Sequence, residues 1–180
     1  DATLSGSVSG SAVTASSASG ALTAGAITST SGVVDLDAST DVTLSGNITS
    51  ASALSIDTSG GDVTQGASTT ITSGTTTTLN ATGDVALNGS ISATVVDVET
   101  TGGTLSVNDV TSTSGAIDLD ATGNVAIAGD LTSASTLDVA SSAGTLTQAN
   151  GSTLAGTGAT TITSSGDATL SGSVSGSAVT

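Results

Sequence analysis

The 180-residue sequence contains no cysteine, proline, methionine, phenylalanine, tyrosine or tryptophan. Without cysteine there is no disulfide framework, so cross-links cannot stabilise the fold. Without aromatic side chains, any hydrophobic core must be narrow and filled with Val, Leu, Ile and Ala. The lack of proline suits hydrogen-bonded ladders, because proline removes a backbone donor from an interior strand. These absences predict a fold held by backbone ladders and stacked aliphatic side chains.

Lysine, arginine and histidine are also absent, and 15 acidic residues give a formal net charge of −15. Phosphate binding requires Lys or Arg, so nucleic acid is excluded as a partner. Catalysis near neutral pH uses a base or an activated nucleophile; since His, Cys and Lys are all missing, we expect no enzymatic activity and assign no catalytic or cofactor-binding residue. No run approaches the roughly 18 apolar residues of a membrane span, so we expect no membrane insertion.

An internal repeat is the strongest positive signal. The segment 1–14 (DATLSGSVSGSAVT) recurs letter for letter as the segment 167–180, so that each position i matches position i + 166. Half that offset also aligns the chain with itself: SGVVDLDAST from Ser31 matches SGAIDLDATG from Ser114. We therefore interpret 1–180 as one continuous segment with tandem units 1–83 and 84–166, followed by 167–180 as the start of the next repeat. Such periodicity is typical of solenoids.

Each 83-residue unit divides into four segments, which in the first unit begin at Asp1, Ala21, Asp41 and Asp62. Most segments begin after a glycine, as at Gly61-Asp62 and Gly123-Asn124, and these dipeptides mark turns. Apolar and polar residues then alternate in three short runs, which is typical of strands with one buried face. We predict an all-β fold, a right-handed parallel β-helix (β-solenoid) with about 20–22 residues and three short strands per coil. A string of 83-residue β-sandwich domains is the alternative, but sandwich cores usually contain Trp or Tyr.

In the predicted coil, equivalent residues form columns along the axis, so Val42, Val63 and Val85 should stack in successive coils. Gln65 and Gln148 interrupt one aliphatic column, once per 83-residue unit. Each is either turned outward or buried with hydrogen bonds to the backbone. We favour the outward orientation, because this coil has extra residues that can shift the register.

Two Thr-rich runs, 75–78 and 160–163, raise the question of an ice-binding face. Such a face needs Thr at the same outward position on every coil, whereas these runs recur only in every fourth coil. High β-propensity of Thr on an exposed strand is the favoured interpretation.

The segments DVTLSGNITSASALSIDTSGGDV (41–63) and SGAIDLDATGNVAIAGDLTSASTLDV (114–139) resemble repeats of filamentous haemagglutinin-type exoproteins. Those are large bacterial surface adhesins, exported by two-partner secretion and folded as right-handed β-helices. The resemblance covers the whole chain and rests on aliphatic alternation, Gly-Asp or Gly-Asn corners and coils of this length. It implies a giant repetitive extracellular adhesin or filament. The near-exact long repeat and the missing basic and aromatic residues favour a filament over direct receptor binding.

Acidic residues are the only ionisable side chains, and one set lies at outward positions of the third run in several segments. If the coils stack in register, five of them form one patch: Asp97, Glu99, Asp118, Asp120 and Asp138. Like charges about 5 Å apart repel by roughly 1 kcal/mol in water. Calcium takes six to eight oxygen ligands and would relieve this repulsion, so these five are calcium candidates, although no cofactor is required. The alternative is a solvated acidic face that keeps shafts apart.

These features predict a structural protein: a rigid extracellular or cell-surface filament, or an adhesin stalk, built from tandem β-helical repeats. The expected partner is the protein itself, through continuation or end-to-end stacking of repeats, with lateral bundling as a further option. Two alternatives remain. One is an adhesin whose exposed solenoid face binds a surface or polysaccharide directly, and the other is a calcium-stiffened extracellular matrix protein.

Overall fold

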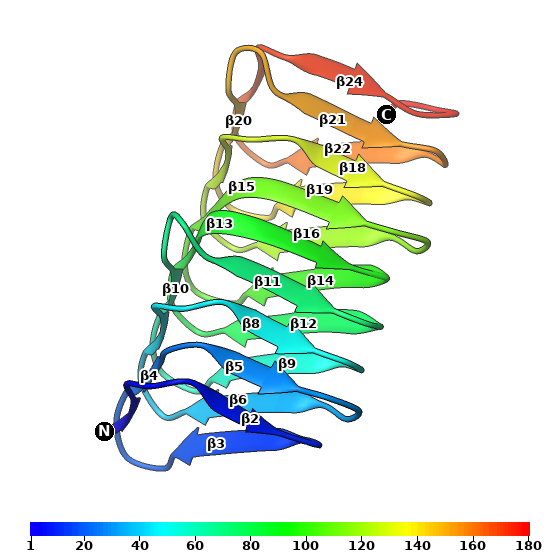
Figure 1. Ribbon diagram of the computed structural model, residues 1–180. Coiled ribbons are helices and arrows are strands. Elements are labelled where there is room, and N and C mark those ends of the chain that lie inside the picture. The colour runs from blue at the N-terminus through cyan, green and yellow to red at the C-terminus, as the bar shows by residue number, and fades with distance from the viewer.

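The computed structural model describes residues 1–180 as a stack of about eight coils along one axis (Figure 1). It contains 24 strands and no helix, hence none that could span a bilayer. The chain runs from the N-terminal coil at the bottom of Figure 1 to the C-terminal coil at the top. The predicted fold class, an all-β right-handed parallel β-helix, is confirmed.

Each coil contributes up to three strands. The first, second and third strands of successive coils lie above one another and form three columns. The first column contains β1 (Ala2–Leu4), β4 (Leu22–Ala24), β7 (Val42–Leu44), β10 (Val63–Gln65), β17 (Val125–Ile127), β20 (Leu146–Gln148) and β23 (Ala168–Leu170). The second contains β2 (Val8–Gly10), β5 (Ile27–Ser29), β8 (Ile48–Ser50), β11 (Thr70–Ser73), β18 (Leu131–Ser133), β21 (Thr153–Gly156) and β24 (Ser173–Ser175). In two central coils a single strand covers both columns: β13 (Val85–Ala93) and β15 (Leu105–Ser112).

The third column is a separate eight-stranded sheet. Its strands are β3 (Val13–Ser17), β6 (Val34–Ala38), β9 (Leu54–Thr58), β12 (Thr76–Ala81), β14 (Val95–Thr100), β16 (Ile117–Ala121), β19 (Leu137–Ser141) and β22 (Thr160–Ser164).

The register follows the repeat. Val63 pairs with Val42 on one side and with Val85 on the other, which confirms the stacking that the fold prediction required. Because side chains alternate across a strand, the apolar residues of each run point inward. They form one continuous core of 35 buried residues, all of them Val, Leu, Ile or Ala. The narrow aliphatic interior expected from the missing aromatics is therefore observed.

Backbone hydrogen bonds join each coil to both neighbours. Leu22 N donates to Asp41 O of the next coil at 2.8 Å, whereas Gly25 N donates to Leu4 O of the preceding coil at 2.7 Å. The chain makes 120 backbone–backbone hydrogen bonds and has no cationic side chain for an ion pair. The ladders and the aliphatic columns are therefore the stabilising elements.

The predicted outward orientation of Gln65 and Gln148 is wrong, because both side chains are buried. The turn between β10 and β11 is two residues longer than the turn below it, since Gln65 pairs with Leu44 and Ile71 pairs with Ile48. Within reach of the buried Gln65 side chain lie the carbonyl of Thr69 at the end of this turn and that of Ser90 in the next coil.

In both 83-residue units the glutamine side-chain amide donates to two backbone carbonyls. Gln65 Nε2 donates to Thr69 O at 3.1 Å and to Ser90 O at 3.2 Å. Gln148 Nε2 donates in the same way to the carbonyls of Ser152 and Ser173, at 2.9 and 3.1 Å. The carbonyls of Thr69 and Ser152 also accept from the backbone N–H groups of Ser90 and Ser173, so the amide adds a second donor, while Oε1 of each glutamine is buried without a partner.

The Thr-rich runs are strands, but their exposed-strand interpretation is only half right. Thr77 and Thr160 are fully buried and occupy a position that is Val, Leu or Ile in the coils between them. Thr78 lies outward, in register with Asp97. The alternation of a strand therefore places Thr on both faces.

Candidate functional site

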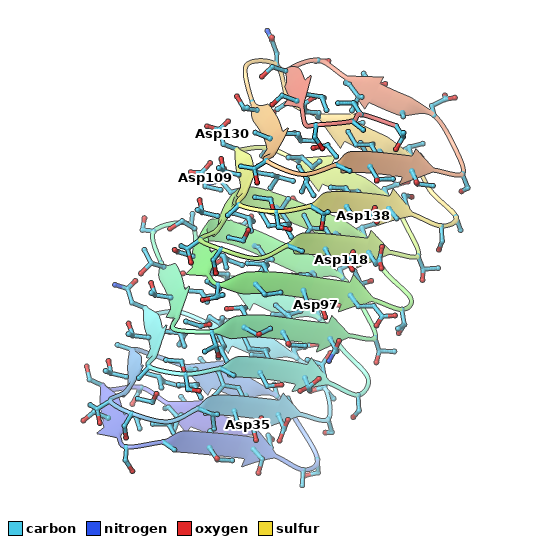
Figure 2. All side chains as sticks on the ribbon, turned by 90° about the vertical axis from the view of Figure 1, so that its right-hand side faces the viewer. Asp35, Asp97, Asp109, Asp118, Asp130 and Asp138 are labelled. Carbon is cyan, nitrogen blue, oxygen red and sulfur yellow. The ribbon has the colours of Figure 1, made fainter.

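Acidic side chains gather on the outer face of the eight-stranded sheet. Asp97, Asp118 and Asp138 occupy one register position on β14, β16 and β19. Figure 2 shows these three side chains following one another up the stack. Glu99 and Asp120 form a second, parallel column two residues further along. The five predicted residues therefore lie in one patch, because each follows an inward-facing aliphatic residue of its strand.

The carboxylates of this patch repel one another. The pKa of Asp118 is raised from 3.8 to about 6. Burial is the largest cause, followed by repulsion from Asp120, Asp138 and Asp97. The pKa of Asp120 is raised as well, first by burial and then by Asp138, Glu99 and Asp97. With no Lys, Arg or His in the chain, only protons or solvent cations can offset this charge.

A tighter acidic cluster lies lower on the same sheet, outside the predicted five. Carboxylate oxygens of Asp35, Asp37 and Asp57 all lie within 4.8 Å of one another, and no trio of the predicted five does so. Burial raises the pKa of Asp37, and the charges of Asp35 and Asp57 raise it further. The sequence signal for this cluster was the same alternation, one 83-residue unit earlier.

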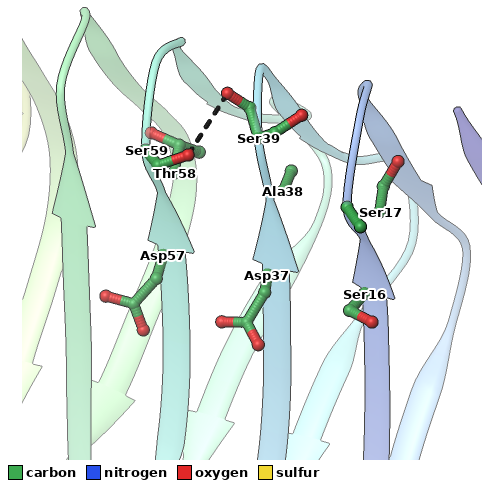
Figure 3. Close-up of a pocket in the computed structure, with 9 residues that line it drawn as sticks. Ser16, Ser17, Asp37, Ala38, Ser39, Asp57, Thr58 and Ser59 are labelled. Atoms are coloured by element: carbon green, nitrogen blue, oxygen red, sulfur yellow. Dashed lines mark hydrogen bonds between the residues drawn. The ribbon is translucent and has the colours of Figure 1, made fainter.

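Asp37 and Asp57 line an open groove with several hydroxyl groups (Figure 3). Their side chains extend to the same side of neighbouring strands, and Ser59 Oγ donates to Ser39 O at 3.4 Å above them. Asp57 already accepts hydrogen bonds of 2.7 Å from Asn80 Nδ2 and from Ser55 Oγ. The groove offers carboxylate and hydroxyl oxygens, which are suitable ligands for a hard cation. Calcium binding by either cluster stays a prediction.

The acidic residues at the corners have a different role, which the sequence analysis did not assign. Asp41 Oδ1 accepts from the backbone N–H of Asp62 at 3.0 Å, and Asp62 Oδ1 accepts from Asp84 N at 2.8 Å. Asn124 does the same for Thr145 N at 2.8 Å. Each oxygen bonds a donor of the following coil at a corner between strands. These residues therefore continue the backbone ladder through the corner, and the neutral amide of Asn serves as well as a carboxylate.

A second corner column repeats this arrangement before the second strand. Asn47 Oδ1 accepts from Thr70 N at 2.9 Å, and Asp109 Oδ1 accepts from Asp130 N at 2.9 Å. Asp130 Oδ1 in turn accepts from Thr153 N at 2.8 Å. Figure 2 shows Asp109 and Asp130 at the edge of the stack away from the acidic patch. The exchange of Asp and Asn at this corner was the sequence signal for the ladder.

Hydroxyl groups form an outward column on the second strands. The column runs through seven consecutive coils: Ser9, Thr28, Thr49, Thr72, Ser92, Thr111 and Thr132. The sequence analysis considered only the Thr-rich runs and missed it. Its signal is the tripeptide Ile-Thr-Ser, which places one Thr between two inward residues at 27–29, 48–50 and 71–73.

Comparison with known protein families, curated proteins and solved structures gave no match. The chain is therefore characterised by its fold and its repeats. Its resemblance to filamentous haemagglutinin-type exoproteins stays a prediction.

Proposed function

We propose that this chain is a structural element, a segment of a rigid extracellular rod in which tandem β-helical units serve as a filament or an adhesin stalk. The observation that supports it is the pairing of one 14-residue sequence at both ends of the stack. As residues 1–14 it pairs with the coil above it, Ala2 with Leu22 and Val8 with Ile27. As residues 167–180 it pairs with the coil below it, Ala168 with Leu146.

Taken together, the two copies show that this sequence can pair with a neighbouring coil on either side. A coil with complementary neighbours on both sides can be followed by another unit in unchanged register. Each coil adds about 4.8 Å along the axis, so a unit of eight coils adds roughly 38 Å. Stability in such arrays adds coil by coil through nearest-neighbour contacts.

The lateral surface fits a rod that stays separate from its neighbours. The net charge is −15, and no cationic side chain is present to pair with another shaft. Like charge keeps proteins soluble and apart. The absence of Lys and Arg also removes every cleavage site for trypsin-type proteases, which supports an extracellular location.

The test is a chain with two consecutive 166-residue units, compared with the 180-residue chain by small-angle scattering and electron microscopy. The longer chain has about seven more coils, so we expect the long dimension to grow by roughly 35 Å while the cross-section stays constant. In the two-unit chain, Leu170→Asp should bend or separate the rod at the junction, because Leu170 continues an inward column. Thr169→Asp, on the outer face of the same strand, is the matched control. Two units that form separate particles on a flexible linker would refute the proposal.

A second candidate function is direct binding of a polysaccharide surface, which the hydroxyl column favours. Its groups repeat about every 4.8 Å on a straight face, and most are exposed. Thr49→Asp with Thr111→Asp should abolish co-sedimentation with an insoluble polysaccharide. The same change at Thr23 and Thr43, outward on the first strands, should leave it intact. If the unaltered chain does not co-sediment with any insoluble polysaccharide tested, this candidate function is wrong. The rod proposal is unaffected by that result.

A further inference from the structure

The chain contains two Asn-Gly dipeptides, and the fold places them in contrasting environments. Asn150 and Gly151 form the tip of the turn between β20 and β21, and both are exposed. The turn is closed by Ser152 N, which donates to Ala149 O at a long 3.3 Å. Gly151 has a φ of 85°, the left-handed value required at the third position of a type II turn. No atom lies within 4 Å of a Cβ built on Gly151.

Asn88 and Gly89 lie inside strand β13 instead. The Nδ2 group of Asn88 donates to Gln65 O at 3.1 Å, which fixes the side chain. Gly89 is buried against the backbone and side chain of the preceding coil, beside Gln65 Nε2. Asn88 and Gly89 lie where the register of β13 shifts between Leu87 and Ser90. The hydrogen bond of the Asn88 side chain and the close packing of Gly89 restrain this site, whereas Asn150 is restrained only by its turn.

We propose that Asn150 is a self-modification site, at which the turn converts asparagine to aspartate and isoaspartate without an enzyme. The backbone nitrogen of Gly151 loses its proton to water or hydroxide and bonds to Cγ of Asn150. The Cγ–Nδ2 bond then breaks and ammonia leaves, giving a cyclic imide. One water opens the imide at either carbonyl. Glycine permits the attack because it carries no side chain to block it and restricts its backbone least.

The consequence is one added negative charge per 166-residue unit, acquired with age. Only one of the two 83-residue units carries the site, because the corresponding turn in the other unit has Ala67 and Ser68. The new carboxylate lies in the turn before Thr153, whose N–H bonds the corner residue Asp130. The isoaspartate product also lengthens the main chain of the turn by one methylene, outside the core.

The folded 180-residue chain is incubated in mildly alkaline buffer, and its mass and its isoaspartate content are followed by mass spectrometry and enzymatic methyl transfer. We expect a gain of about 1 Da per chain, located at Asn150. Asn150→Ala, the residue present at the corresponding position 67, should abolish it, and Asn88→Ala should leave it unchanged. In urea both dipeptides should react at similar rates, whereas in the folded chain Asn150 should react at least about tenfold faster. Equal rates in the folded chain, or no reaction at Asn150, would overturn the proposal.

Discussion

Gly89 lies directly against the side-chain amide of Gln65 in the preceding coil: a Cβ on Gly89 would come within 2.6 Å of Gln65 Nε2. The same relationship recurs in the second unit, where a Cβ on Gly172 would lie 2.5 Å from Gln148 Nε2. Each buried glutamine thus requires a residue without a side chain above it. The pair is a structural unit that accompanies the longer turn in every fourth coil.

Gly89→Ala should therefore destabilise the fold. The added methyl group meets both the glutamine amide and the backbone of Thr69, and such overpacking costs about 1–3 kcal/mol. Denaturant unfolding followed by circular dichroism measures the change. Gly6→Ala is the matched control, since no atom lies within 4 Å of a Cβ there. Equal loss in the two variants would contradict the packing argument.

Gln65→Leu should also lower the free energy of unfolding. Leucine restores the aliphatic column and removes the unpaired Oε1, which offsets part of the loss. It also removes the two hydrogen bonds from Nε2 to the carbonyls of Thr69 and Ser90, each worth about 0.5–1.5 kcal/mol, although Thr69 O keeps its bond from Ser90 N. Leu44→Met, in the same column one coil below, is a control of similar volume. If Gln65→Leu were more stable than the unaltered chain, the amide would not be needed to satisfy the turn.

The corner ladder predicts different outcomes for two substitutions of Asp62. Asp62→Asn keeps an oxygen that accepts from Asp84 N, so stability near neutral pH should be unchanged or slightly higher. Asp62→Ala removes the acceptor and should cost about 0.5–1.5 kcal/mol. Equilibrium unfolding of the two variants side by side is the measurement. A loss in Asp62→Asn as large as in Asp62→Ala would show that charge, rather than the hydrogen bond, matters at the corner.

Acidification should stabilise this protein. The pKa of Asp118 is about 6 in the folded state against 3.8 for the free side chain, so between these values the folded chain binds more protons than the unfolded chain. The free energy of unfolding therefore rises as pH falls from neutral through 6 and levels off near 3.8. Because the group still contacts solvent, its contribution is about 1 kcal/mol or less. Asp118→Asn should flatten the profile measured by thermal unfolding; a steeper profile in that variant would refute the assignment.

The calcium expectation can be tested on the same patch. Millimolar calcium should raise the melting temperature by more than sodium chloride of equal ionic strength, by about 2–4 °C. We expect Asp118→Asn with Asp120→Asn to lose this increment and Asp35→Asn with Asp37→Asn to retain it. The reverse result would place the ion at the tighter cluster formed by Asp35, Asp37 and Asp57. No difference between the two salts would leave the acidic face as a solvated surface.

The sequence by itself determined the winding of the chain. Alternation in the three short runs, together with a turn that recurs once per segment, was enough to predict the columns. Val63 accordingly lies between Val42 and Val85. This was possible because each contact repeats a local pattern: a strand in a solenoid meets its own equivalent one coil away. The outward patch from Asp97 to Asp138 followed from the same alternation.

The tertiary structure alone decided how individual polar groups are satisfied. Gln65 was predicted to point outward because the extra residues of its coil can shift the register, but its amide donates to the carbonyls of Thr69 and Ser90 inside the coil, and only the folded structure reveals them. The corner aspartates were read from the sequence only as turn markers, because their partner, a backbone N–H of the next coil, exists at every residue and so does not single them out. Periodicity fixes which side chains share a column, whereas hydrogen bonding depends on local backbone geometry that the period does not specify.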